Sequence, residues 1–549
     1  MGNKIDRVIM LLFVLVLYGA SYIPLWKNFQ RVPKDRYYFG SVDYAIDVLG
    51  NLTTVRQGFL GHWQRRSPVT TTMVGKPSFL KFEYIAIGQL ARMGRVDPTI
   101  MYYLARGMLS LVVVVMIVWL VYQMIQKPLA RIAAIAMILF ATGITEPWKS
   151  YPYRIMDVMP GDTMVFQRLT LAAPHYLLGI LLPLCSIVFL ARFIDRKKFS
   201  FFLLSVASGM LGTLVYSPSM VLVVLSLPLL FLKKKTHRGA IFLYAILSLL
   251  PVIYIRYVSQ FWDFSAFSKT EFVVPFRLSP LDYPFAVGVP FLLALFSLKR
   301  VLTSKNTMLL ILFPWLLTHP FATLVVAYFA HINPSRFFFG PYFVVFGILG
   351  ALGIKEILAF IQHQSDGAGF IRRQTFTYLF GAVLFLAVFA PSYISYGASM
   401  QNIQNCFCNV RFFDYGYPKK DLMDALFWLR DHTSEFDTVL SVPYTGAIIP
   451  AFSANPVYTS WWLRIMDEQA FGQTEDVLKK FYSGTMPESE VRRLIADNHI
   501  SYVLVGDQEK TYGDTTSLSK YPFLTPVASF GTYRLIHPFG TTTLYRVGL

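Results

Sequence analysis

Long apolar stretches alternate with short polar connections along most of the chain, and this alternation constrains the fold more than any other feature. A bilayer core requires about 20 consecutive apolar residues in helical form. Stretches that reach or approach this length lie near 8–26, 101–125, 131–147, 173–194, 199–214, 217–232, 240–258, 284–298, 307–330, 337–355 and 375–395. The sequence therefore predicts a polytopic α-helical membrane protein with about eleven transmembrane helices. The two short stretches that meet at Tyr216-Ser217-Pro218 predict a hairpin or a broken helix.

The overall composition supports this class. Of 549 residues, 55% are hydrophobic and only 15% are charged, whereas soluble domains carry about 25% charged residues. Three cysteines are too few for a disulfide-dense secreted scaffold. The net charge of +19 would suggest nucleic-acid binding in a soluble protein, so its distribution along the chain decides what it means.

The positions of Lys and Arg predict the orientation of the chain. With the N-terminus in the cytoplasm, the inside segments hold 18 basic and 4 acidic residues, a net charge of +14. Every second loop carries this excess, as the positive-inside rule requires. Most of the positive charge is thus a topology signal, and no nucleic-acid partner is predicted. An odd number of spans places the C-terminal region outside a bacterial cytoplasmic (inner) membrane.

Two outside segments are longer than simple connections. We expect residues 1–396 to form the membrane domain, with a long first outer loop at 27–98. Amphipathic pieces near 41–62 and 77–94 of that loop are expected to lie along the membrane interface. Residues 397–549 have the composition of a soluble domain on the same side.

The predicted outer domain alternates strands with helices. We expect a helix that opens at Pro418 and Asp421, and further helices near 473–482 and 487–497. Strands are expected at 437–442, near 456–459, and at 500–505, 532–537 and 541–547. This order indicates a small α/β domain with a mixed sheet.

Two carboxylates follow the first span on the outer side. Asp43 and Asp47 are four residues apart, so a helix would place both on one face. Such a pair can deprotonate an acceptor hydroxyl or amine, or help to hold a divalent cation such as Mg²⁺ or Mn²⁺. The alternative is a solvated helix face whose carboxylates pair with Arg36 or Arg56.

Basic residues in the first outer loop are not explained by topology. Residues 27–98 hold 11 basic and 5 acidic residues, an excess of +6 that includes Arg56 and Lys76. These side chains suit a phosphate-bearing lipid or sugar donor. General attraction to anionic lipid headgroups is the alternative.

Later outer segments add further candidates. Arg336 precedes three phenylalanines at the outer entry to a late span, where a phosphate is a natural partner for its guanidinium; snorkelling to the interface is the alternative. His175 opens another span and is a candidate for contact with substrate or for an interfacial cap. Asp162 and Arg168, in the loop before it, are candidate groups near the substrate.

No P-loop, GxGxxG, HExxH or paired CxxC pattern is present. Nucleotide-driven transport and zinc-protease activity therefore lose their usual sequence support.

The order of parts resembles that of the GT-C membrane glycosyltransferases. In that superfamily a first helix leads to a long outer loop with an early acidic residue, many spans follow, and an outer domain often completes the chain. The stretch that begins Lys76-Pro77 resembles the juxtamembrane helix of the mannosyl- and aminoarabinose-transferase types, and Arg336 resembles the arginine that meets the lipid-linked phosphate. The His-Pro-Pro of the mannosyltransferases and the Trp-Trp-Asp-Tyr-Gly of the oligosaccharyltransferases are absent.

The resemblance implies an enzyme that transfers a hexose or pentose from a polyprenyl-phosphate-linked donor to an extracytoplasmic glycan, lipid or protein acceptor. Asp43 or Asp47 would act as base or metal-supported activator, and Arg336, with Arg56, would bind the donor phosphate. Two alternatives are a lipid or solute transporter or flippase and a non-catalytic glycan-binding membrane protein.

Overall fold

The computed structural model describes residues 2–40, 45–67, 69–71, 76–143, 173–261, 280–281, 283–330, 332–364, 370–405, 415–531 and 541–548. The chain divides into two compact units. The first unit comprises Met1–Pro24, Arg106–Ile255 and Val274–Gln404, and the second comprises Leu25–Ala105, Arg256–Val273 and Asn405–Leu549.

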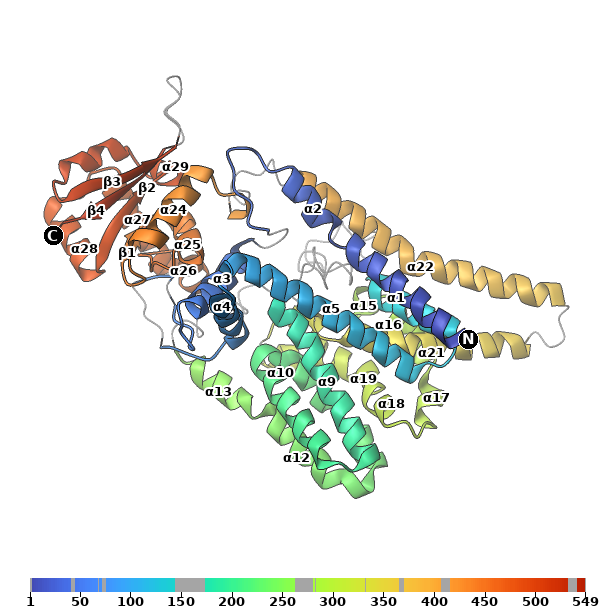
Figure 1. Cartoon of the computed structure of the whole chain (residues 1–549). Helices are drawn as coiled ribbons and strands as arrows, with labels where there is room; N and C mark the ends of the chain where they lie inside the picture. Colours follow the sequence, from blue (N-terminus) through green and yellow to red (C-terminus); the bar gives the residue numbers. More distant parts are fainter. Residues whose placement is uncertain are drawn as a thin grey trace. The chain divides into compact units, whose positions relative to one another are not determined.

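Helices dominate the described chain (Figure 1). In its first half they are α1 (Gly2–Ala20), α2 (Ile23–Gln30), α3 (Ala45–Phe59), α4 (Phe82–Gly94), α5 (Pro98–Met124), α6 (Pro128–Phe140), α9 (Pro174–Arg196), α10 (Phe199–Leu225), α11 (Pro228–Lys233), η2 (Lys235–His237), α12 (Arg238–Leu249) and α13 (Pro251–Val258). The next group is α15 (Tyr283–Val287), α16 (Val289–Leu295), α17 (Leu298–Leu302), α18 (Thr307–Leu312), α19 (Trp315–Phe321), η3 (Ala322–Val326), α20 (Ala327–Ala330), η4 (Pro334–Phe339), α21 (Tyr342–Gln364) and α22 (Phe370–Asn405).

The chain is a polytopic membrane protein. Within the described residues, seven helical segments are long and apolar enough to cross a bilayer. They are Met10–Gln30, Pro98–Met124, Pro174–Arg196, Phe199–Lys233, Lys235–Val258, Thr307–Phe329 and Tyr342–Ile361; Pro128–Phe140 and Thr377–Pro391 are shorter apolar helices. The sequence predicted about eleven apolar stretches. Part of the difference arises because 199–214 and 217–232 count as one continuous segment, although the chain reverses between them, and because 284–298 divides into the short helices α15 and α16.

Helix α10 is broken where the sequence predicted a hairpin or a break. Tyr216 has φ −153° and ψ 79°, outside the helical region. Pro218 follows two residues later, and its missing amide and bulky ring disfavour an unbroken helix there. The chain reverses at this break: Lys234 Nζ lies 4.0 Å from Asp195 Oδ1, and the His237 ring lies 6.0 Å from that of Phe193, at the end of α9 where α10 begins. The hairpin alternative is therefore confirmed.

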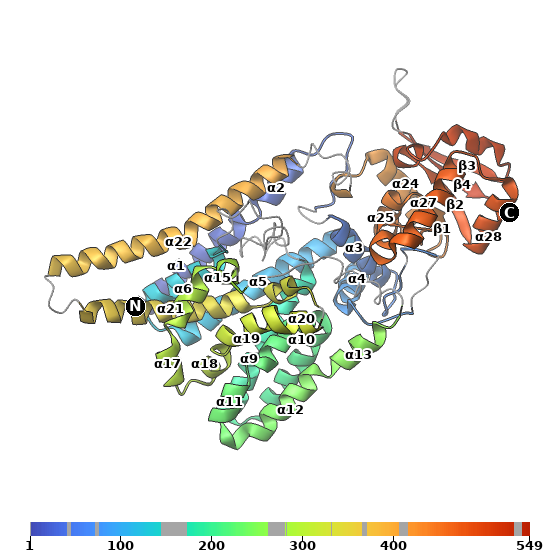
Figure 2. The ribbon, with the colours of Figure 1, turned by 180° about the vertical axis from the view of Figure 1, so that it is seen from behind.

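Hydroxyl groups and small residues join α9, α10 and α12, which lie side by side in both views (Figures 1 and 2). The Ser186 hydroxyl lies 2.6 Å from the Tyr244 hydroxyl, and Ser205 donates to the Ser186 carbonyl at 2.8 Å. A side chain at Gly209 would come within 2.4 Å of Ser248 Oγ. Between lipid-exposed helices, close packing and hydrogen bonds replace the hydrophobic drive available in water.

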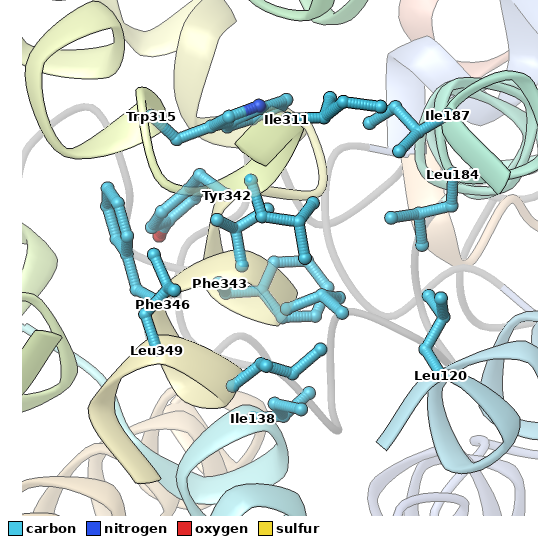
Figure 3. Packing of buried hydrophobic residues seen from close by; sticks show 14 of the residues in the cluster. Leu120, Ile138, Leu184, Ile187, Ile311, Trp315, Tyr342, Phe343, Phe346 and Leu349 are labelled. Atoms are coloured by element: carbon cyan, nitrogen blue, oxygen red, sulfur yellow. The ribbon is translucent and has the colours of Figure 1, made fainter. Parts of the chain in front are cut away.

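The core of the first unit contains large apolar side chains from several helices (Figure 3). The view labels Leu120, Ile138, Leu184, Ile187, Ile311, Trp315, Tyr342, Phe343, Phe346 and Leu349. Trp315 and Phe346 are fully buried. The same core includes Phe337 and Phe338 of η4, the segment that carries Arg336.

The second unit contains a four-stranded mixed sheet, as the sequence predicted. Its strands are β1 (Thr438–Leu440), β2 (Ile500–Val505), β3 (Leu524–Phe530) and β4 (Thr542–Val547). Their order is β1-β2-β4-β3 (Figure 1). The first pair is parallel and the other two are antiparallel. The helices of this region are α24 (Lys420–His432), α25 (Pro443–Phe452), α26 (Trp461–Met466), α27 (Glu468–Tyr482), α28 (Glu488–Asp497), α29 (Asp507–Lys510) and η6 (Thr515–Lys520).

Two predictions for this sheet need correction. Residues 456–459 were expected to form a strand, but Val457 makes only one parallel bridge, to Val439. Strand β3 was not predicted, because Pro526 interrupts its apolar pattern; proline is tolerated where a strand lies at a sheet edge. The predicted strand at 532–537 lies outside the described residues.

The first outer loop and the C-terminal segment share one hydrophobic core. It combines Leu49, Leu52 and Val55 of α3 with Leu426 of α24 and Ile448 of α25, among others. Each of these five side chains is at most 1% exposed. Burial of a side chain of this size in a water-excluded core contributes about 1.5–3 kcal/mol, so this shared core is a major source of stability for the second unit.

Helices α3 and α4 cross with their backbones in contact. A side chain added at Gly88 would lie 2.0 Å from the Val55 carbonyl oxygen and 2.7 Å from the Gly58 Cα. Neither backbone atom can move without separating the two helices. Glycine is therefore required at this crossing for steric reasons.

We expect Gly88→Ala to destabilise the second unit by about 2–3 kcal/mol through overpacking, which lowers its Tm by several degrees. Gly472→Ala is the matched control, because a side chain there meets nothing within 4 Å and alanine favours the helix. Thermal unfolding of the full chain in detergent measures both variants. A Gly88→Ala Tm equal to that of the native chain would contradict this account of the crossing.

Candidate functional site

Arg336 lies in the short 3-10 segment η4, whose backbone is held from outside. The side-chain oxygen of Asn333 accepts a hydrogen bond from the Ser335 amide at 2.9 Å. The Tyr216 hydroxyl, at the break in α10, donates to the Arg336 carbonyl at 2.6 Å. Hydrogen bonds in a 3-10 segment have poorer geometry than those in an α-helix. The bonds from Asn333 and Tyr216 therefore help to fix the backbone position of Arg336.

A buried histidine holds the same segment. His319 Nε2 lies 3.1 Å from the Phe337 carbonyl oxygen, and its Nδ1 lies 2.7 Å from the Tyr283 hydroxyl. A carbonyl oxygen only accepts, so Nε2 carries the proton and, in the neutral ring, Nδ1 accepts from Tyr283. Phe337 and Phe338, each 1% exposed, anchor the segment in the core while Arg336 stays half-buried.

Aromatic rings lie close to this arginine segment. The Tyr176 ring stacks on the Phe339 ring with centroids 4.3 Å apart. The His175 ring lies 3.9 Å from that of Tyr176 and 6.4 Å from that of Tyr216. The fold thus brings His175 and η4 together through the two tyrosines. An arginine side chain on such a segment can bind a phosphate bidentately through its guanidinium.

The predicted carboxylates belong to the second unit. Asp47 is exposed in the first turn of α3, where the helix dipole favours its negative charge. Asp43 lies outside the described residues. Arg56 is nine residues further along the same helix, which separates it from Asp47 by about 13 Å along the helix axis.

Arg56 lies in the interior of the second unit. It is 6% exposed, and among the described residues its Nε has no hydrogen-bond partner. Burial lowers the pKa of Arg56 to about 10, and the nearby charge of Arg430 acts in the same direction. Asp97 and Asp431 oppose this shift.

The remaining predicted residues are placed as follows. Lys76 is exposed, and its Nζ lies 4.7 Å from the centre of the Phe261 ring. Asp162 and Arg168 fall outside the described residues. Across the described ranges, no group of three or more His, Cys, Asp or Glu side chains is placed to hold a metal ion.

One buried carboxyl group was not among the predicted site residues. Glu83, in the first turn of α4, is 5% exposed, and its Oε2 has no hydrogen-bond partner in the described part of the chain. Burial raises the pKa of Glu83 to about 7, and the positive charges of Lys81 and Arg65 only partly oppose this. Lys81 Nζ is bound to Asn51 Oδ1 at 3.1 Å. The sequence could have pointed to Glu83, because it is the one acidic residue in the apolar helical stretch Phe82–Gly94.

The fold is shared with solved glycosyltransferase structures. An oligosaccharyltransferase from Archaeoglobus fulgidus, tethered to an acceptor peptide, superposes with a TM-score of 0.51 at 11% identity, over 96% of this chain and 75% of that one. The same enzyme in complex with Zn and sulfate gives 0.50 at 14% identity, over 94% and 72%. ArnT from Cupriavidus metallidurans, bound to undecaprenyl phosphate, gives 0.45 at 12% identity, over 98% of both chains.

These likenesses confirm the predicted GT-C resemblance at the level of the fold. No family model matches the sequence, and no curated protein matches it.

We expect Glu83→Gln to stabilise the protein at pH 8 and to have little effect near pH 4.5. The folded-state pKa of about 7 exceeds the unfolded value of 4.5, so native stability falls as pH rises through this window, by about 3 kcal/mol in total. Glutamine has no charge to bury and removes that loss.

The measurement is Tm against pH for Glu83→Gln, the native chain and the exposed control Glu490→Gln. A Tm difference between Glu83→Gln and the native chain that stays constant from pH 4.5 to 8 would show that Glu83 does not titrate in this range.

Proposed function

We propose that this protein is a membrane glycosyltransferase that transfers a hexose or pentose from a polyprenyl-phosphate-linked donor to an extracytoplasmic acceptor. The observation that carries the proposal is the half-buried Arg336, on a backbone held by Tyr216 and His319, in a fold shared with an oligosaccharyltransferase. That archaeal enzyme was solved with an acceptor peptide. Its likeness supports a separate acceptor here, and the lipid-linked donor is proposed from the resemblance in the sequence.

The donor phosphate is assigned to Arg336. As the bond between the anomeric carbon and the phosphate oxygen breaks, the phosphate leaves with the electron pair and its negative charge grows. A guanidinium that is already oriented stabilises this developing charge without reorganising. His175 is proposed to contact the same substrate from the start of α9, and the exposed Lys76 is proposed to guide the phosphate from the outer loop. Arg56, 6% exposed in the interior of the second unit, is not assigned to the phosphate.

The acceptor is assigned to the carboxylates. Asp43 or Asp47 takes the proton from an acceptor hydroxyl or amine as that atom attacks the anomeric carbon, so a new glycosidic bond forms as the donor bond breaks. Attack opposite the leaving phosphate inverts the anomeric configuration. Asp162 and Arg168 are proposed to lie near the acceptor.

The proposed topology follows the charge distribution. The N-terminus lies in the cytoplasm, and the first outer loop 27–98 and residues 397–549 lie on the outer face of a bacterial inner membrane. The excess of six positive charges in residues 27–98 would then lie on the same side of the membrane as the phosphate of the lipid-linked donor.

The proposed step uses the carboxylate as a base, and a divalent cation such as Mg²⁺ or Mn²⁺ would support the same carboxylate. Asp47 is the described member of the carboxylate pair, and within the described residues no group of three or more His, Cys, Asp or Glu side chains is placed to hold a cation. The neighbouring enzyme was solved with Zn and sulfate, which is a property of that enzyme.

We expect the double variant Asp43→Asn, Asp47→Asn to lose transfer by at least 10²-fold, the usual scale of general-base catalysis, with an unchanged Tm. Asp476→Asn is the matched control, since Asp476 is an exposed carboxylate that pairs with the exposed Lys479 at 3.5 Å. Mass spectrometry of envelope glycans from a gene-deletion strain, complemented with each variant, measures the product. Full product from the double variant would remove these carboxylates from the mechanism.

We expect Arg336→Ala to reduce donor turnover by about 10²–10³-fold, as loss of a transition-state charge partner does, and Arg336→Lys to recover part of it. Arg300→Ala is the control, because Arg300 is half-buried and paired with Glu356 at 3.5 Å. Release of polyprenyl phosphate from purified protein supplied with polyprenyl-phosphate-linked hexose or pentose gives the rate. The assignment fails if Arg336→Ala and Arg300→Ala turn over equally.

A further inference from the structure

The reversal of the chain at Tyr216 brings three polar connections to one end of the first unit. They are residues 195–198 between α9 and α10, 233–238 between α11 and α12, and 304–307 at the start of α18. Lys234 Nζ lies 4.0 Å from Asp195 Oδ1, and the Thr307 hydroxyl donates to the same oxygen at 2.5 Å. Asp195 therefore links all three connections, and α9, α11 and α18 pack together there (Figure 2).

These connections carry a large excess of positive charge. Together they hold eight basic residues and one acidic residue, Asp195. Lys234 pairs with Asp195, and Arg238 Nε donates to the Phe231 carbonyl at 3.1 Å. The other six cations are exposed and make no ion pair within the described residues; they are Arg196, Lys197, Lys198, Lys233, Lys235 and Lys305.

The positive-inside rule explains the sign of these charges but not their convergence. The rule concerns the charge of each connection separately, and it does not require connections from different parts of the chain to place their cations together. Charges of one sign repel each other when they are brought close, so this grouping costs free energy. A bound anion would offset the repulsion and stabilise the packing of α9, α11 and α18.

Large apolar side chains adjoin the cations. Phe199 follows Lys198 and is 63% exposed, and Leu232 precedes Lys233 and is 62% exposed. Both belong to the segment Phe199–Lys233, which is long and apolar enough to cross a bilayer. They therefore meet acyl chains where the segment leaves the hydrocarbon. A ligand with both a phosphate and acyl chains matches the cations and these side chains, whereas a free anion matches the cations alone.

We propose that this end of the first unit binds an anionic phospholipid. Its phosphate contacts Lys198 and Lys233, and its acyl chains cover Phe199 and Leu232. In the proposed topology this end faces the cytoplasm, where clusters of basic residues beside membrane helices attract anionic headgroups. Lipid binding at this end does not require transferase activity, so it is tested separately from the proposed function.

The test is native mass spectrometry of the full chain in detergent, titrated with cardiolipin or with zwitterionic phosphatidylcholine. We expect cardiolipin to bind more tightly than phosphatidylcholine. The double variant Lys198→Gln, Lys233→Gln is expected to bind cardiolipin at least about tenfold more weakly, because each lysine near a headgroup contributes about fivefold. The matched control is Lys480→Gln, Lys520→Gln, which removes the same charge from exposed positions of the second unit and is expected to bind as the native chain does.

Cardiolipin binding by Lys198→Gln, Lys233→Gln that equals binding by the native chain would overturn the proposal. An equal loss in the control pair would do the same, because attraction by net charge alone acts on both pairs alike. Equal affinity for phosphatidylcholine, or displacement of cardiolipin by inorganic phosphate at the same concentration, would also reject a phospholipid site. A second pair of exposed residues, Lys235→Gln and Lys305→Gln, is expected to show the same loss, so the test does not depend on the folding of one variant.

Discussion

The packing of the first outer loop against the C-terminal segment is the interaction on which the second unit depends. Leu49 and Leu52 of α3 are buried in the same core as Ile448 of α25. Backbone bonds extend this contact, since the Tyr37 amide donates to the Pro418 carbonyl at 2.8 Å. Residues nearly 400 positions apart in the sequence therefore belong to one folding unit, and Asp47 takes its position from that unit.

The two units hold their charged side chains in different ways. In the first unit, hydrogen bonds to its backbone hold Arg336 in place. Its side chain stays half-buried, because full burial of a permanent charge within the membrane is costly. In the second unit, burial raises the pKa of Glu83 to about 7 and lowers that of Arg56 to about 10. Arg56 stays charged near neutral pH, whereas Glu83 changes its ionisation there, so the stability of that unit depends on pH.

Local pattern predicted the regular elements of the outer domain well and its irregular ones poorly. Helices α24 and α28 and strands β2 and β4 lie where the sequence placed them, because their apolar period is unbroken. Helix α25 was not predicted, because Pro443 and Pro450 argue against a helix and its nearly complete burial leaves no alternation of apolar and polar residues. For the candidate site, the basic and acidic residue types could be proposed, but Tyr216 and His319 could not, because their role is to hold another residue's backbone.

Hydropathy and charge alone determined that this chain crosses a membrane many times, since a bilayer admits only long apolar helices and basic loops favour one side. The resemblance to GT-C enzymes likewise depended on the order of parts. Only the tertiary structure decided that the break at Tyr216 is a hairpin, that the His175 ring lies near that of Tyr216, and that Glu83 is shielded from water. These features depend on contacts between segments far apart in sequence, which no local pattern encodes.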